Sequence, residues 1–304
     1  MRKSEIIDRA RGFCQPFRVG EGGGFRLRDV DPASTLDLDP SDKQAAEAIL
    51  KEGVELLSEL QDMLYAQDHW GVLLLFQAMD AAGKDSTIKH VMSGVNPQGC
   101  QVTSFKTPSA EDLDHDFLWR CQRHLPERGR IGIFNRSYYE ETLVVRVHPE
   151  LLARQKLPPK LVDPQIWKER FRDIRQFEAY LGRNGIVVRK VYLHLSRQEQ
   201  KKRFLKRLDA PEKNWKFSAA DVRERAHWDA YMEAYEDMIQ HTATEEAPWY
   251  VVPADHKWFT RLVVAAALID TLLSLDLRYP TLSTDASQEL EAARQELLAE
   301  SPHP

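Results

Sequence analysis

Residues 71–90 read GVLLLFQAMDAAGKDSTIKH, and this stretch decides the fold. Its first part, Gly71–Gln77, is a short continuous apolar run, which is typical of a strand buried on both faces of a sheet. A loop of small residues follows, and Gly83 and Lys84 then lead into a predicted helix. This order favours a phosphate-binding turn, because the loop N–H groups and the helix N-terminus can converge on phosphate oxygens.

The predicted phosphate-binding residues belong to this loop and the first helical turn: Ala81, Ala82, Gly83, Lys84, Asp85 and Ser86. Lys84 supplies a mobile positive charge for a transferring phosphoryl group. The standard pattern G-x-x-x-x-G-K-[ST] is matched incompletely, since Ala78 replaces its first glycine and Asp85 its serine or threonine. An acid within the loop repels phosphate unless a metal lies between them, so Asp80 is predicted to help bind Mg²⁺. The alternatives are an ordinary strand–turn–helix corner and a turn-forming Asp80.

A second polar cluster, IFNRSYYEE at residues 133–141, follows the third predicted strand. Ligands of open parallel sheets bind beyond the carboxyl ends of the strands, so this cluster should face the same crevice as the loop. Asn135 stands where many P-loop enzymes carry a metal-binding aspartate, and Arg136 can neutralise phosphate charge. Glu140 and Glu141 are predicted to hold the metal or to orient the acceptor. The alternative is a helix cap with surface charges.

Four further apolar runs predict strands, at Gln101–Phe105, Arg130–Phe134, Ile186–Leu195 and Trp249–Val252. Predicted helices separate or flank them, at 43–66, 83–93, 110–124, 164–181, 220–240, 258–276 and 286–300. This alternation predicts an α/β fold, a three-layer sandwich in which helices cover both faces of a parallel five-stranded sheet. Residues 1–42 are rich in glycine and proline and predict an extended arm. The main domain is expected at 43–280, and a helix and tail at 281–304.

Residues 196–218 read SRQEQKKRFLKRLDAPEKNWKFS and are strongly basic. Arg203 and Arg207 lie four residues apart, on one face of a helix, and Lys216 follows in a second aromatic and basic segment. We expect a helical lid over about residues 200–225, in which these three cations bind a polyanion longer than one nucleotide. The alternative is a solvated charged face. Arg120 lies on the helix predicted at 110–124 and is expected to point toward the crevice.

The composition limits the other functions of the chain. Its 304 residues carry a formal net charge of −5, which does not favour a nucleic-acid-binding or membrane-surface protein. Its three cysteines form no Cys-x-x-Cys pair and fit reduced thiols in a cytoplasm. No signal peptide is predicted, and the longest apolar stretch, Leu262–Leu275, is too short to span a bilayer. The ten histidines show no zinc-binding spacing.

Four segments together resemble the polyphosphate kinase 2 family over roughly residues 40–280: FQAMDAAGKDSTIKHVMSGVNPQG at 76–99, GIFNRSYYEE at 132–141, QKKRFLKRLDAPEKNWKFS at 200–218 and APWYVVPAD at 247–255. The resemblance implies a P-loop kinase fold with a helical lid. It also implies transfer of the terminal phosphoryl group of inorganic polyphosphate to a nucleotide with Mg²⁺, or Mn²⁺ in its place. A homo-oligomer, either a dimer or a tetramer, is implied as well.

The resemblance gives roles to the clusters. Asp80 and Lys84 match the acid and the lysine of the family's phosphate loop, and Arg203 and Arg207 match arginines of its lid. The expected metal ligands are Asp80, Glu140 and Glu141. The expected nucleotide contacts are Arg120, Asn135, Arg136 and Glu141.

The Asn-Arg-Ser segment followed by an acidic pair resembles the subgroup that acts on both AMP and ADP. No residue fixes the base, so guanine nucleotides stay open as acceptors. Three alternatives remain: an ADP-only polyphosphate kinase, an ATP-dependent P-loop kinase of a nucleoside or small metabolite, and a non-catalytic protein that binds polyphosphate or nucleotides.

Overall fold

The computed structural model describes residues 3–39, 43–211 and 219–300. Its centre is one six-stranded sheet with the order β1-β6-β5-β2-β4-β3. The strands are β1 (Arg18–Val19), β2 (Gly71–Ala78), β3 (Cys100–Ser104), β4 (Ile131–Asn135), β5 (Ile186–His194) and β6 (Trp249–Pro253). The strands β2 to β6 pair in parallel, as predicted, but the predicted number of five strands was wrong. The sixth, β1, adds antiparallel to β6 and is too short to show a residue pattern.

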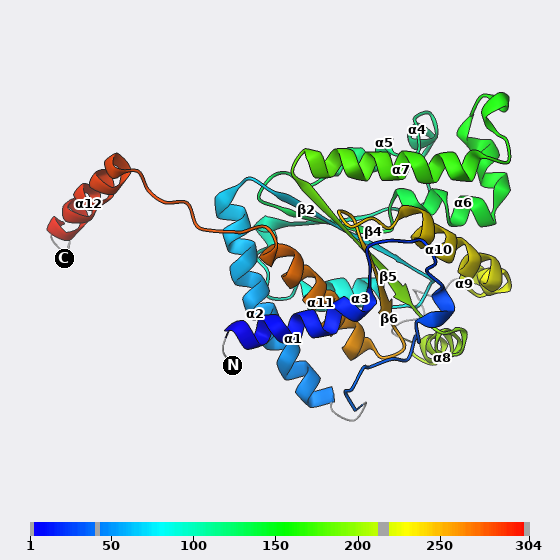
Figure 1. Cartoon of the computed structure of the whole chain (residues 1–304), viewed down its shortest axis with the longest axis horizontal. Helices are drawn as coiled ribbons and strands as arrows, with labels where there is room; N and C mark the ends of the chain where they lie inside the picture. Colours follow the sequence, from blue (N-terminus) through cyan, green and yellow to red (C-terminus); the bar gives the residue numbers. More distant parts are fainter. Residues whose placement is uncertain (1–2, 40–42, 212–218, 301–304) are drawn as a thin grey trace.

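Helices cover both faces of the sheet (Figure 1). One face carries α1 (Lys3–Cys14), α2 (Lys43–Gln67), α3 (Lys84–Val91) and α11 (Lys257–Leu273). The other carries α5 (Trp119–Gln122), α6 (Val144–Val147), α7 (Ile166–Arg183) and α10 (Trp228–Thr242). The side chains of β2 alternate between the two cores, with Leu74 on the first face and Leu73 and Leu75 on the second. Burial on both faces explains why β2 reads as an unbroken apolar run.

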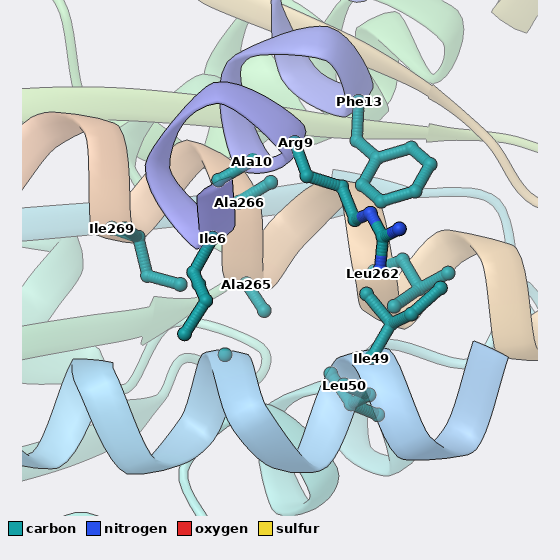
Figure 2. Close-up of a pocket in the computed structure, with 11 residues that line it drawn as sticks. Ile6, Arg9, Ala10, Phe13, Ile49, Leu50, Leu262, Ala265, Ala266 and Ile269 are labelled. Carbon is teal, nitrogen blue, oxygen red and sulfur yellow. The ribbon is translucent and has the colours of Figure 1, made fainter. Parts of the chain in front are cut away.

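Residues 1–42 were expected to form an irregular arm. This expectation was wrong for Lys3–Cys14, which form α1. α1 is a helix, and its side chains Ile6 and Phe13 line a space between α1, α2 and α11, together with Leu50 of α2 and Leu262 of α11 (Figure 2). A cavity of about 20 Å³ remains between these helices. The apolar spacing at Ile6, Ala10 and Phe13 forms the helical stripe, because residues three and four apart share a face. Pro16 follows the end of α1, and the chain continues in a 3₁₀ turn, Gln15–Phe17.

One further helix departs from the predicted layout. The helix expected at 110–124 is interrupted, with α4 (Ala110–Leu113) and α5 as its two short pieces. The Asp116 carboxylate accepts the Leu118 N–H at 2.9 Å, a local bond that competes with helix continuation. At the other end of the chain, α12 (Thr284–Ala299) has no buried residue and lies away from the body in Figure 1.

The predicted lid begins at the end of β5. Here α8 (Arg197–Leu208) is capped by Ser196, whose hydroxyl accepts the Glu199 N–H at 3.1 Å. α9 (Ala219–Glu224) follows, and a 3₁₀ turn, Arg225–His227, leads into α10. None of the helices in the described part of the chain combines the length and apolar character needed to span a bilayer. The division into an arm, a main domain and a tail stays a prediction.

The packing of the first residues predicts a stability effect. The Phe17 side chain is buried, and its ring meets the Phe259 ring of α11 edge-on at 5.9 Å. Phe17→Ala should lower the free energy of unfolding by about 3 kcal/mol, measured by urea denaturation. Leu297→Ala on α12 is the matched control, because this leucine is 67% exposed. Equal effects of the two substitutions would contradict the docking of the first helix.

Candidate active site

The loop between β2 and α3 has a left-handed backbone at two positions. Ala81 has a φ of +64° and Gly83 a φ of +105°. Gly83 opens α3, and its carbonyl accepts the Thr87 N–H at 2.9 Å. This region is open to glycine, whereas a residue with a Cβ is strained there by about 1 kcal/mol or more. The turn brings the loop backbone and the first turn of α3 together at the carboxyl end of β2, as a phosphate-binding loop requires.

Four charged side chains meet beside this loop. The Lys84 ammonium donates to the Ala78 carbonyl at 2.9 Å. Arg136 lies between two carboxylates, 3.2 Å from Asp80 Oδ1 and 3.4 Å from Glu140 Oε2. Removal from water, and then repulsion by Arg136, lower the pKa of Lys84, whereas Glu140 is the main cause of a raised pKa for Arg136. Two cations and two carboxylates therefore share one site at the ends of β2 and β4.

Two hydrogen bonds fix the first turn of α3. Asn135 Nδ2 donates to Asp85 Oδ1 at 2.7 Å, so two of the three residues that depart from the usual P-loop enzymes are partners. Arg261 Nη2, from α11, donates to Ser86 Oγ at 3.1 Å. Sequence reasoning missed Arg261, although an arginine inside an otherwise apolar stretch was a usable signal.

Arg203 supports the phosphate-binding loop through hydrogen bonds to its backbone. Its guanidinium donates all five N–H groups to protein acceptors: Glu199 Oε1 and the carbonyls of Ala81, Ala82, Ala254 and Asp255, at 2.6–3.2 Å. The residue is 9% exposed. An arginine has five N–H donors and no more, so this arrangement leaves none for a phosphate. In this structure Arg203 supports the loop and the segment after β6, and its contact with polyphosphate stays a prediction.

A second support was missed in the sequence. Gln200 lies one turn before Arg203 on α8 and is 1% exposed. Its Nε2 donates to the Asp80 carbonyl at 2.9 Å, and its Oε1 accepts from Arg225. The base of the lid is thus bonded directly to the phosphate-binding loop. The sequence signal for Gln200 was weak, because a glutamine within a strongly basic stretch is usually exposed to solvent.

The remaining lid residues have different positions. Arg207 Nη1 lies 3.9 Å from Asp221 Oδ2 and connects α8 to α9. Its guanidinium also lies over the Phe204 ring, 5.5 Å from the centroid. Lys216 lies outside the described residues. Three other lysines of α8 are exposed to solvent: Lys201, Lys202 and Lys206.

A cavity of about 240 Å³ opens beside the charged site. Its lining includes Arg136 and Glu140 of the charged site, together with the cations Lys106 and Arg120. Polar residues such as Asp112, Asp116 and Arg154 also line it, and its apolar lining includes Leu113, Phe117, Val144, Val145 and Leu151. Arg120 Nη1 donates to the Lys106 carbonyl at 2.8 Å, which fixes the guanidinium on the cavity wall. Cations beside an apolar wall suit a ligand with a charged part and a flat organic part.

Glu141 also lines this cavity, but it does not join Asp80 and Glu140. Its carboxylate is 3.1 Å from Arg170 Nε and accepts from Gln155 Nε2 at 2.7 Å. Burial raises the pKa of Glu141 despite these partners. Among the described residues, no three His, Cys, Asp or Glu side chains gather as a metal site. Of the three expected metal ligands, Asp80 and Glu140 lie together with Arg136 between them, whereas Glu141 pairs with Arg170.

These features define a class of protein. A phosphate-binding loop follows the central strand of a parallel sheet, a lysine and an arginine flank it, and carboxylates lie within reach of both. That arrangement is the site of a P-loop phosphotransferase, in which the protein positions phosphates and neutralises their charge.

Comparison with known proteins identifies the family. The family model described as "Polyphosphate kinase 2 (PPK2)" matches residues 40–278. The chain belongs to the polyphosphate kinase 2 family, which confirms the resemblance seen in the sequence. Phosphotransferases of this family generally use a divalent metal ion.

Individual relatives are similar over nearly the whole chain. An "ADP-polyphosphate phosphotransferase" of Rhodopseudomonas palustris is 52% identical, over 93% of this chain and 97% of its own. An "AMP/ADP-polyphosphate phosphotransferase" of Meiothermus ruber is 43% identical, over 90% and 98%. The crystal structure of polyphosphate kinase 2 from Arthrobacter aurescens TC1 superimposes with a TM-score of 0.83 at 40% identity, covering 92% of this chain and 96% of that one. These matches confirm the predicted fold class.

The contacts of Arg203 lead to a test. Arg203→Lys removes most donors to four backbone carbonyls and should lower the free energy of unfolding by about 2 kcal/mol in urea denaturation. Arg207→Lys is the matched control and should change it by less than about 0.5 kcal/mol, since its ion pair is long and near the surface. An unaltered stability for Arg203→Lys, with a raised KM for polyphosphate, would place Arg203 on the substrate instead.

Proposed function

We propose that this protein transfers the terminal phosphoryl group of inorganic polyphosphate to AMP and to ADP, giving ADP and ATP, in a reversible reaction. The observation that carries the proposal is the group of Asp80, Lys84, Arg136 and Glu140 at the ends of β2 and β4, beside a cavity of about 240 Å³. The two relatives described above support it, because both names include polyphosphate and ADP, and the second adds AMP.

The acceptor nucleotide is assigned to the cavity. Its phosphates would lie toward Arg136 and Arg120, and its base and ribose against the apolar wall around Phe117. Both ends of the cavity are built from segments that follow β3 and β4, where ligands of parallel sheets bind. The acceptor phosphate is already ionised, so the transfer needs no general base, and positioning with charge neutralisation is sufficient.

A divalent cation fits between the loop and the cavity. Mg²⁺ commonly takes one or two carboxylates and completes its shell with water and substrate phosphates. Asp80 and Glu140 supply such a pair, and both are held on Arg136 at 3.2 and 3.4 Å. When bound, the cation neutralises charge on the reacting phosphates, and Mn²⁺ is the alternative ion. Asn135 and Asp85 would then orient the loop rather than bind the metal, since they bond to each other.

Polyphosphate is assigned to the loop and the outer side of the lid. Lys84 and the loop N–H groups would receive the terminal phosphate, while Lys201, Lys202 and Lys206 of α8 extend a positive surface beyond it. A run of exposed cations suits a long polyanion better than a single triphosphate. The use of guanine nucleotides, the dimeric or tetrameric state and the cytoplasmic location stay predictions.

The choice of donor and acceptor tests the proposal directly. Purified protein should convert polyphosphate and AMP to ADP and then ATP with Mg²⁺, and EDTA should stop the conversion. Products are resolved by ion-exchange chromatography for each pairing of polyphosphate or ATP with AMP, ADP, GMP or GDP. Conversion of ADP alone would restrict the acceptor to ADP. An inert polyphosphate together with an active ATP donor would replace the proposal by an ATP-dependent kinase.

The role of Lys84 gives a second test. Lys84→Ala removes the cation nearest the transferring group and should lower kcat on the order of 10³-fold, because charge neutralisation carries most of the rate. Lys89→Ala is the matched control, as Lys89 lies on the same helix and is exposed. A Lys84→Ala protein with the turnover of the Lys89→Ala protein would remove the loop from the catalytic site.

A further inference from the structure

A charged pair lies fully buried beneath the turn that carries Arg136. Glu178 of α7 is 3% exposed, and Lys190 of β5 is 0% exposed. Lys190 Nζ donates to Glu178 Oε2 at 2.6 Å and to the Thr242 carbonyl at 2.7 Å. Burying two charges costs desolvation that their attraction barely offsets, and an apolar pair of similar size is often as stable or more so. The pair therefore calls for an explanation other than stability.

The other oxygen of Glu178 binds the turn itself. The hydroxyl groups of Tyr138 and Tyr139 both donate to Glu178 Oε1, at 2.9 and 2.7 Å. These tyrosines are adjacent in the 3₁₀ turn Tyr138–Glu141 and are 1% and 0% exposed. A carboxylate oxygen can accept two hydrogen bonds at once, which an apolar side chain cannot do. Lys190 balances the carboxylate charge from the opposite side.

The same turn is bonded to the central strand. Ser137 Oγ accepts from Gln77 Nε2 of β2 at 3.1 Å and from the Tyr139 N–H at 3.2 Å. The Arg136 N–H donates to the Phe76 carbonyl at 3.1 Å.

The backbone of Arg136 is left-handed, with a φ of +66°. A side-chain-bearing residue in this region costs of order 1 kcal/mol and persists only where its surroundings hold it. The hydrogen bond from the Arg136 N–H to β2, and those of Ser137, Tyr138 and Tyr139 after it, keep the backbone of Arg136 in this conformation.

We propose that Glu178 is a positioning residue for phosphoryl transfer. Acting through Tyr138 and Tyr139, it fixes the turn after β4, and so places the Arg136 guanidinium and the Glu140 carboxylate opposite Asp80. Glu178 itself does not touch the substrate. Lys190 supports Glu178 by neutralising the charge of its buried carboxylate. This inference rests on the proposed function, in which Arg136 neutralises phosphate charge.

The first experiment removes the two hydroxyl donors and keeps the rings. The double variant Tyr138→Phe/Tyr139→Phe should lower kcat about 10-fold and leave the KM for polyphosphate within about twofold, since a small misplacement of a catalytic group slows transfer without removing a substrate contact. Tyr192→Phe is the matched control, because this buried tyrosine bonds only weakly to Met232 Sδ, at 3.9 Å, and should keep the wild-type kcat. The single variants should give intermediate losses, which keeps the test open if the double variant does not fold.

A double-mutant cycle separates positioning from general destabilisation. In an Arg136→Lys protein the tyrosine substitutions should lower kcat by a clearly smaller factor than in the wild type, because one of the two groups that they position has already been replaced. The same fold-loss in both backgrounds, or a wild-type kcat for the tyrosine variants, would overturn the inference. A wild-type kcat for Arg136→Lys alone would instead refute the role given to Arg136 in the proposed function.

Discussion

The site depends on a strained backbone that is kept in place by hydrogen bonds from neighbouring side chains. The phosphate-binding loop carries a left-handed Ala81, and it stays in place because Arg203 bonds to the carbonyls of Ala81 and Ala82 and Gln200 bonds to that of Asp80. Buried carbonyls need donors, and a guanidinium provides several in one fixed plane. Because both supports lie on α8, the base of the lid and the loop form one bonded unit.

The same principle applies on the other side of the crevice. Arg136 also has a left-handed backbone, and the turn that follows it is bonded to β2 through Ser137 and to Glu178 through two tyrosines. Ala81 directly follows Asp80, which pairs with Arg136, so both strained positions adjoin the charged site. Strain at such positions persists where neighbouring bonds over-determine the backbone. The site is therefore preorganised, so that its charges need little rearrangement when phosphates arrive.

Sequence reasoning succeeded where one residue pattern determines one structure. The apolar run at Gly71–Gln77 identified the central strand, and the small-residue loop after it identified the phosphate-binding turn. It failed for α1, since the glycines and prolines after Gln15 dominated the composition and hid the stripe at Ile6 and Phe13. It also failed for β1, where two residues cannot display a period and the antiparallel partner lies more than 200 residues away.

Predicting the partners of charged side chains was harder. Arg203 and Arg207 are equivalent in sequence, four residues apart on one helix, yet Arg203 donates to five protein acceptors, whereas Arg207 lies 3.9 Å from Asp221 of α9. The difference lies in which turn of α8 lies against the loop, and that depends on tertiary packing. Glu141 likewise follows Glu140 directly, but it pairs with Arg170, which lies on another helix. Adjacent residues in a turn point in different directions, so an acidic pair need not act as a unit.

The molecule uses its charges in two distinct ways. Arg203 and Lys190 are buried, and their N–H groups are bonded to carbonyls and carboxylates, so they act on the shape of the protein. Lys201, Lys202 and Lys206 are exposed, where a cation attracts a polyanion without a large desolvation cost. This separation reconciles a net charge of −5 with a polyphosphate substrate. The attraction for the polyanion is local to α8. At physiological ionic strength, exposed charges more than about 8 Å apart are largely screened, so the acids farther away on the chain oppose this attraction only weakly.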